Sequence, residues 1–258
     1  DIRDLPHLLI AGSTGGGKSV FLNSTLLSLM NSSDNIRLYL LDLKMGVELA
    51  PYKDLDNVKL ATDEAEAVLL LEEVVNEMRG RLAHLGDTGT NKIDFEGGKN
   101  DLIVVAIDEA SVLYGKERLD SDRKKMVEKA RTMTDLIAKQ ARACGIHLIL
   151  ATQKVNKETL DTKIQTNLDG RVCFRVASTA DSNTAIGNKL AADLPAIKGR
   201  AIWARGPDFV EVQTPFLSMP DVKEEIENLK PKFPLPVATT PATTSNAKKE
   251  NKIHTITV

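Results

Sequence analysis

This 258-residue sequence has few aromatic residues, only two cysteines and a net charge close to zero. A formal charge of -2 at pH 7 means that no overall basic field attracts nucleic acid, so any such contact has to come from local loops. The two cysteines, Cys144 and Cys173, lie in separate apolar runs, and their spacing indicates neither a metal site nor a disulfide framework. Buried free thiols in a reducing cytosol are the favoured interpretation.

Long apolar runs are also missing. No stretch approaches the roughly 18 apolar residues of a membrane-spanning helix, and the N-terminus lacks the layout of a signal peptide. With 42% hydrophobic and 27% charged residues, the composition is that of a soluble globular protein. The segment Asp1–His7 leads almost at once into an apolar strand, so we expect a cytoplasmic domain taken from a longer polypeptide. Any membrane anchor is expected in a region outside this chain.

Short β-type apolar runs alternate with longer helical patterns along the first two thirds of the chain. This alternation is typical of an α/β fold in which helices cover both faces of a mostly parallel sheet. The expected strands are His7–Ala11, Leu38–Asp42, Leu102–Asp108, His147–Thr152 and Arg171–Val176. The expected helices are Lys18–Met30, Asp63–Leu85 and Arg123–Cys144.

The last third of the chain predicts smaller elements. They are a short helix at Asp181–Ile186, a hairpin of Ala201–Ala204 and Phe209–Gln213, and a helix at Asp221–Leu229. The segment after the last helix is rich in Thr, Ala, Ser and Lys and shows no periodicity, which favours disorder. We therefore expect one domain over residues 1–230 and a disordered tail over residues 231–258.

A glycine-rich segment follows the first strand and opens the first helix. Three consecutive glycines let the backbone turn its N–H groups toward phosphates, and the positive end of the helix dipole faces the same anion. The spacing matches the phosphate-binding loop of nucleotide hydrolases, which predicts Lys18 on the β- and γ-phosphates and Ser19 on Mg²⁺. The residues expected to bind ATP are Gly12, Ser13, Thr14, Gly15, Gly16, Gly17, Lys18, Ser19 and Val20.

Two adjacent carboxylates, Asp108 and Glu109, end a buried strand at the edge where α/β sheets bind ligands. We expect Asp108 to hold Mg²⁺, directly or through water, and Glu109 to orient and polarise the attacking water. Gln153 ends the next expected strand and is placed to sense the γ-phosphate. These residues, with Lys18, predict hydrolysis rather than nucleotide binding alone.

Several segments together resemble the motor domain of the FtsK/SpoIIIE family of ring-shaped translocases. In the order of the family, they are Leu5–Ser19, Leu41–Met45 with Glu48–Leu49, Ile107–Glu109, Ala141–Gln153, and Asn167–Ser178 followed by Asp181–Ser182. The block that runs from Gly-Ile-His to Ala-Thr-Gln is much more specific than the phosphate loop alone. Together the segments cover most of residues 5–213.

The resemblance implies a RecA-like P-loop NTPase that works as a homohexamer, with ATP bound between subunits and an arginine supplied by the neighbour. Arg171 aligns best with that arginine, and Arg175, four residues along the same expected strand, is the runner-up. A rigid guanidinium can neutralise the charge that develops on the γ-phosphate. The catalytic residues so expected are Lys18, Asp108, Glu109, Gln153 and Arg171.

The resemblance also implies double-stranded DNA as a partner, bound without sequence preference. Two loops are expected to face the pore of the ring: Gly86–Gly98, and Lys154–Asn167 with its Lys154, Lys157 and Lys163. Lysine, asparagine and backbone N–H groups suit a DNA backbone rather than base edges.

This chain departs from the family pattern in having Leu43 where the family usually has proline, and Ala110 where it usually has an aromatic residue. The leading hypothesis is an ATP-driven DNA translocase or conjugative coupling-type motor, of the kind encoded by conjugative or integrative elements. One alternative is a related motor that moves protein substrates, as in type VII secretion. Another is a nucleotide-binding module that regulates assembly without turnover.

Overall fold

The computed structural model describes residue 2 and residues 5–44, 46–95, 100–114, 120–154 and 162–234. One eight-stranded sheet organises this part of the chain, in the order β3-β2-β4-β5-β1-β6-β7-β8. The strands are β1 His7–Ala11, β2 Ile36–Asp42, β3 Val58–Ala61, β4 Leu102–Asp108, β5 Ile146–Thr152, β6 Gly170–Phe174, β7 Arg200–Arg205 and β8 Asp208–Gln213. The pairs from β3 to β6 are parallel, whereas β7 is antiparallel to both β6 and β8.

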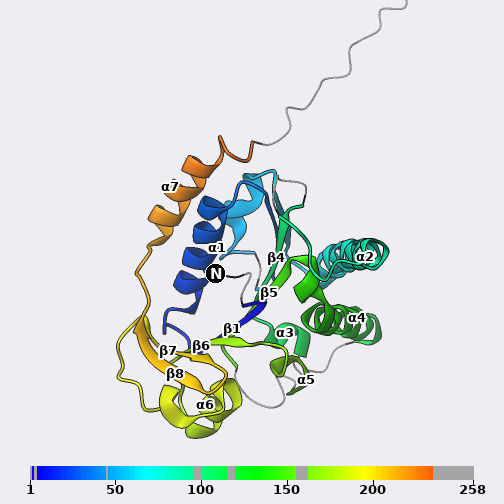
Figure 1. Cartoon of the computed structure of the whole chain (residues 1–258). Coiled ribbons are helices and arrows are strands. Elements are labelled where there is room, and N and C mark those ends of the chain that lie inside the picture. Colours follow the sequence, from blue (N-terminus) through cyan, green and yellow to red (C-terminus); the bar gives the residue numbers. More distant parts are fainter. Residues whose placement is uncertain are drawn as a thin grey trace, which may run out of the picture.

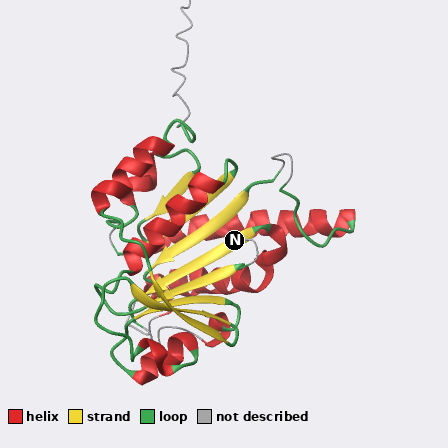
Figure 2. Cartoon of the chain, turned by 60° about the vertical axis from the view of Figure 1, so that its left-hand side comes forward, coloured by secondary structure: helices red, strands yellow, loops and turns green. Residues whose placement is uncertain are grey.

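Helices cover both faces of the sheet, as Figures 1 and 2 show. The α-helices are α1 Lys18–Ser32, α2 Glu64–Thr88, α3 Ser111–Tyr114, α4 Ser121–Gln140, α5 Thr162–Gln165, α6 Thr179–Ile186 and α7 Met219–Leu229. Three 3₁₀ helices complete the described elements: η1 Ala50–Asp54, η3 Ala141–Cys144 and η4 Lys189–Ala191. None of the described helices is both long enough and apolar enough to cross a membrane.

The alternation of side chains along the strands divides the core into two layers. Leu9 of β1 points into the layer formed with α2 and α4, whereas Leu8 and Ile10 point into the layer formed with α1 and α7. Strands β4 and β5 are buried along their whole length on both faces, as is normal for the central strands of a parallel sheet. The α/β fold with helices on both faces, expected from the sequence, is confirmed.

Several element boundaries differ from those expected. Strand β3 was not predicted, because its four residues are too short a run to stand out and two of them are not buried. The helix expected at Arg123–Cys144 is α4, which ends at Gln140; a 3₁₀ turn follows, closed by Gly145 at a φ of 67°. Strand β6 ends at Phe174, two residues earlier than expected.

The ordered domain extends slightly beyond residue 230. Phe233 was placed in the tail by its sequence context, but its ring is buried against the layer of α1 and α7. The Lys232 ammonium donates a hydrogen bond to the Met30 carbonyl at the end of α1 (2.7 Å). The rest of the expected disordered tail, residues 235–258, lies outside the described residues.

The two loops expected to face a pore are attached at opposite ends of the parallel strands, one at the amino ends and one at a carboxyl end. The first was expected to begin at Gly86, but α2 continues to Thr88 and Gly89 caps it at a φ of 67°. The Ile93 N–H then donates to the Ala143 carbonyl (2.9 Å), which places this loop at the amino ends of β4 and β5. The second loop follows β5 at its carboxyl end, and its residues 155–161, with Lys157, lie outside the described residues, as does the side chain of Lys163.

Candidate nucleotide-binding site

The phosphate loop connects β1 to α1 and owes its shape to close packing on β6. Gly12, Gly15 and Gly17 have φ values of 143°, 77° and 120°, which residues with a Cβ rarely adopt. A Cβ on Gly12 would lie 2.6 Å from the Cβ of the buried Phe174. The Ser13 N–H also donates to the Arg175 carbonyl (3.1 Å). The strand next to β1 therefore positions the loop before any nucleotide arrives.

Lys18 is the first residue of α1, and its side chain turns back into the phosphate loop. Its ammonium donates hydrogen bonds to the Gly12 carbonyl (2.7 Å) and the Ser13 carbonyl (3.1 Å), and it is 6% exposed. Burial lowers the pKa of Lys18 to about 8, although the nearby Glu109 opposes the shift. Two neutral carbonyls stabilise a buried cation less than an anion would, so the site favours the arrival of a phosphate.

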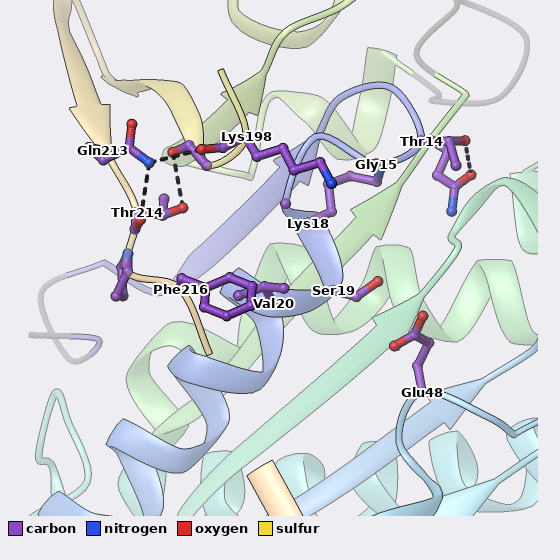
Figure 3. Close-up of a pocket in the computed structure, with 14 residues that line it drawn as sticks. Thr14, Gly15, Lys18, Ser19, Val20, Glu48, Lys198, Gln213, Thr214 and Phe216 are labelled. Carbon is purple, nitrogen blue, oxygen red and sulfur yellow. Dashed lines mark hydrogen bonds between the residues drawn. The ribbon is translucent and has the colours of Figure 1, made fainter. Parts of the chain in front are cut away.

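A cleft of about 380 Å³ opens in front of the loop, a size that suits a small organic ligand. Figure 3 shows Lys18, Ser19 and Val20 on one wall, Glu48 opposite Ser19, and the segment from Gln213 to Phe216 on another wall. Phe216 is 83% exposed and lines the cleft together with Val20.

The wall that carries Phe216 is fixed to the phosphate loop through Gly199. The Gly199 N–H donates to the Gly16 carbonyl (2.9 Å), and the Gly199 carbonyl accepts from the Thr214 N–H (2.8 Å). The Thr214 hydroxyl adds a second bond to the same carbonyl (3.0 Å). Gly199 has a φ of 80°, which favours glycine, and a Cβ there would lie 3.2 Å from the Thr214 carbonyl oxygen.

Asp108 ends β4, and β5 separates β4 from β1 and its phosphate loop. The side chain is 8% exposed, and within the described part of the chain we find no hydrogen bond to its carboxylate. Burial raises the pKa of Asp108 to about 6, and the nearby Asp42 and Glu48 add to the shift. This concentration of negative charge on a desolvated carboxylate is suited to a cation.

Glu109 follows Asp108 and is the one non-glycine residue with a positive φ, 62°, among the residues that the structure describes. Strained backbone of this kind is common at functional sites. The carboxylate accepts hydrogen bonds from the Ser111 hydroxyl (2.5 Å) and the Thr152 hydroxyl (3.0 Å), and pairs with the Lys44 ammonium (2.9 Å). Burial works against ionisation, but the bonds from Ser111 and Lys44 hold the pKa of Glu109 below its usual range.

Gln153 connects the two halves of the site from the end of β5. Its side-chain oxygen accepts a hydrogen bond from the Thr14 hydroxyl of the phosphate loop (2.7 Å). Its backbone N–H donates to both carboxylate oxygens of Glu109 (3.2 and 3.3 Å). A shift of the phosphate loop can therefore reach Glu109 through one residue.

The two candidate arginines lie near the start of β6 and directly after its end. Arg171 is half-buried, and its guanidinium donates to the carbonyls of Leu168 (3.2 Å), Ala185 (3.1 Å) and Gln165 (2.8 Å). These carbonyls orient the side chain without neutralising its charge, and burial lowers the pKa of Arg171. Arg175 is exposed and lines a second hollow on the far side of the phosphate loop. Neither arginine lines the cleft of its own chain.

Sequence reasoning missed two parts of the site. The ion pair of Lys44 with Glu109 joins loops that follow different strands, and only a Lys two residues after a buried Asp hinted at it. The cleft wall at Gly199 and Gln213–Phe216 lies next to the hairpin of β7 and β8, far from the phosphate loop in sequence, and no local motif predicts it. An aromatic residue in a polar, Pro-containing segment, here Phe216, was the available signal.

A parallel sheet, a glycine-rich loop at the start of α1 and a carboxylate pair at the end of β4 define a nucleotide-binding P-loop ATPase domain. Known proteins place the chain more narrowly. Residues 1–125 match the model of the FtsK/SpoIIIE family. The DNA translocase SftA of Bacillus subtilis is 38% identical over 199 residues, which cover 72% of this chain and 20% of that protein.

The DNA translocase FtsK of Agrobacterium fabrum is 31% identical over 265 residues, which cover 89% of this chain and 29% of that protein. Among solved structures, the pCW3 conjugation coupling protein TcpA, in its monomer form with ATPγS, matches with a TM-score of 0.82 and 30% identity. That match covers 89% of this chain and 66% of TcpA. The chain therefore carries an ATPase domain of the FtsK/SpoIIIE family, as its motifs indicated. It spans only 29% and 20% of the two curated relatives.

Proposed function

We propose that this chain is the motor domain of an ATP-driven translocase of double-stranded DNA. The observation that carries the proposal is the connection of phosphate loop, Gln153 and Glu109 by hydrogen bonds, because such a connection links nucleotide state to the water-activating carboxylate. DNA as the moved polymer is supported by the relatives named DNA translocases. A cytoplasmic location follows for a domain that acts on ATP and DNA.

Each residue of the site has a distinct task in hydrolysis. Lys18 exchanges the carbonyls of Gly12 and Ser13 for the β- and γ-phosphates of ATP, so its ammonium is neutralised by the substrate. Glu109 accepts a hydrogen bond from the attacking water and orients it toward the γ-phosphate. Gln153 reports the position of the phosphate loop to Glu109.

Mg²⁺ fits the residues around Asp108. Within the described residues no group of three or more His, Cys, Asp and Glu side chains forms a metal site by itself. This agrees with the usual chemistry of Mg²⁺, which takes one or two protein oxygens and completes its shell with water and substrate phosphates. The desolvated Asp108 carboxylate and the Ser19 hydroxyl would hold the ion, which supplies positive charge to the β- and γ-phosphate oxygens when bound.

The adenine base would lie against Phe216. The exposed ring and Val20 offer an apolar surface at the end of the cleft away from Glu48. Stacking on such a ring shields the base from water and contributes to affinity without reading the phosphates.

Arg171 is the proposed trans-acting arginine of a homohexamer. Its guanidinium is preorganised by three carbonyls of its own chain and keeps its full charge, which is what a neighbour's γ-phosphate requires. Arg175 is the second candidate, since it is exposed beside the phosphate loop.

The proposal is tested by ATP turnover of the purified protein with and without double-stranded DNA at low salt. We expect clear stimulation by DNA of unrelated sequences, and loss of turnover in Glu109→Gln with retention of bound nucleotide. Turnover that DNA leaves unchanged would favour a protein-moving motor. Equal turnover of Glu109→Gln and the unmodified protein would favour a regulatory module.

A further inference from the structure

The loop that follows β2, defined here as residues 43–44 and 46–49, reaches both the catalytic carboxylate and the nucleotide cleft. Lys44 pairs with Glu109, and Glu48 lines the cleft opposite Ser19 (Figure 3). The buried Asp42 carboxylate fixes the loop by accepting the N–H groups of Lys44 (3.3 Å), Glu48 (2.9 Å) and Leu49 (3.0 Å). One loop therefore carries a cation to Glu109 and an anion to the place where phosphates bind.

Four donors surround the carboxylate of Glu109. One oxygen accepts from Ser111 (2.5 Å), Thr152 (3.0 Å) and the Gln153 N–H (3.2 Å). The other oxygen accepts from Lys44 (2.9 Å) and again from the Gln153 N–H (3.3 Å). An ionised carboxylate offers about four lone-pair sites, so water gains a full site only when a donor turns away. The single hydrogen of the Thr152 hydroxyl can also be donated to the Lys154 carbonyl (3.1 Å), whereas the Lys44 ammonium holds the other carboxylate oxygen.

Lys44 is the donor that can leave. Ser111 begins α3 two residues after Glu109, Thr152 ends the central strand β5 and Gln153 follows it, so their backbone positions are fixed by the core. The Lys44 side chain is long, lies on a loop and is 41% exposed. Water can replace Glu109 as its partner at little cost.

We propose that Lys44 is a positioning residue that holds Glu109 in a resting arrangement and so limits ATP turnover until the loop after β2 moves. This inference rests on the proposed role of Glu109 in hydrolysis. The same loop lines the cleft through Glu48, so the charge of bound nucleotide is the event that moves it.

The test is steady-state ATP turnover of Lys44→Met without DNA. We expect kcat to rise about twofold to fivefold, the factor that corresponds to loss of a partly exposed ion pair, with KM changed less than about twofold. Lys44→Arg keeps the cation and should raise kcat much less. Lys53→Met, which removes an exposed lysine from η1, serves as the matched control and should match the unmodified protein.

A second variant shows whether Lys44 acts through Glu109. In Lys44→Met with Glu109→Gln, the gain in kcat should vanish, because the residue being released is absent. A fall in kcat for Lys44→Met, a rise in KM at constant kcat, or no change would each overturn the inference and leave the proposed function standing. A gain in kcat with no effect of DNA would support the restraint and contradict DNA translocation.

Discussion

The contact of Gly12 with the backbone of Phe174 predicts that the phosphate loop is sensitive to a single methyl group at one glycine and much less at another. In Gly12→Ala, the new Cβ would lie 2.6 Å from the Phe174 Cβ and 3.1 Å from its Cα. In Gly15→Ala, the new Cβ would meet no atom within 4 Å. Both positions have positive φ, but 77° at Gly15 is near the left-handed region that alanine tolerates and 143° at Gly12 is not, so strain and crowding act together at Gly12.

The expected magnitudes follow from these contacts. Backbone strain costs an alanine about 1–2 kcal/mol at the left-handed φ of Gly15 and about 1–3 kcal/mol at the φ of Gly12. Crowding against buried backbone that cannot rotate away costs roughly 1–3 kcal/mol more, and applies to Gly12→Ala alone. For a domain of this size about 1 kcal/mol shifts the melting temperature by about 2–4 °C.

Thermal unfolding followed by circular dichroism, without nucleotide, measures both variants. We expect Gly12→Ala to melt at least roughly 2–4 °C below Gly15→Ala, because of the crowding against Phe174. Omitting nucleotide matters because both glycines line or form the phosphate site, and ligand binding would itself shift the melting temperature. Equal melting temperatures, or a more stable Gly12→Ala, would refute the idea that β6 holds the loop in its binding shape.

Three further predictions concern the base, the pH dependence and the assembly. Phe216→Ala should raise the KM for ATP about tenfold with little change in kcat, because stacking acts on binding alone; a change confined to kcat would contradict it. Burial and the nearby His147 lower the pKa of His7 from 6.5 to about 3. Below pH 6.5 the unfolded chain therefore takes up a proton that the folded chain does not, and stability falls by roughly 1.4 kcal/mol per pH unit. His7→Asn keeps an acceptor for the Leu148 N–H (3.0 Å), so between pH 7 and 5 urea unfolding should show a loss smaller by about 2 kcal/mol than in the unmodified protein. Mixing Arg171→Ala with Lys18→Ala subunits should restore part of the turnover, and assembled mixtures without any rescue would exclude Arg171 as the trans-acting arginine.

The order of elements and the phosphate site could be predicted from the sequence because their signals are local. The apolar run of β1 is followed by the first glycine of the phosphate loop, and that of β4 ends in Asp108. The bounds of both strands were predicted to the residue. The glycines of the phosphate loop are recognisable in the sequence because Gly12, Gly15 and Gly17 adopt positive φ values that favour glycine. Gln153 was found for the same reason, since it directly follows a buried strand.

Pairing of side chains across the sheet could not be predicted in the same way. Lys44 and Glu109 follow β2 and β4, which are neighbours only because the strand order places β4 beside β2. The cleft wall at Phe216 depends on the hairpin of β7 and β8 folding back beside β6. Periodicity and spacing carry no information about such contacts, because they arise between segments distant in the chain.

The sequence by itself determined that this protein has a phosphate loop, a carboxylate pair and an α/β core, since each depends on residues close together in the chain. The tertiary structure decided how those parts meet. It placed Gln153 between Thr14 and Glu109, and it brought Lys44 to the Glu109 carboxylate. The physical reason is that a hydrogen bond requires its partners within about 3.5 Å, and only the packing of the strands brings residues so distant in sequence to that separation.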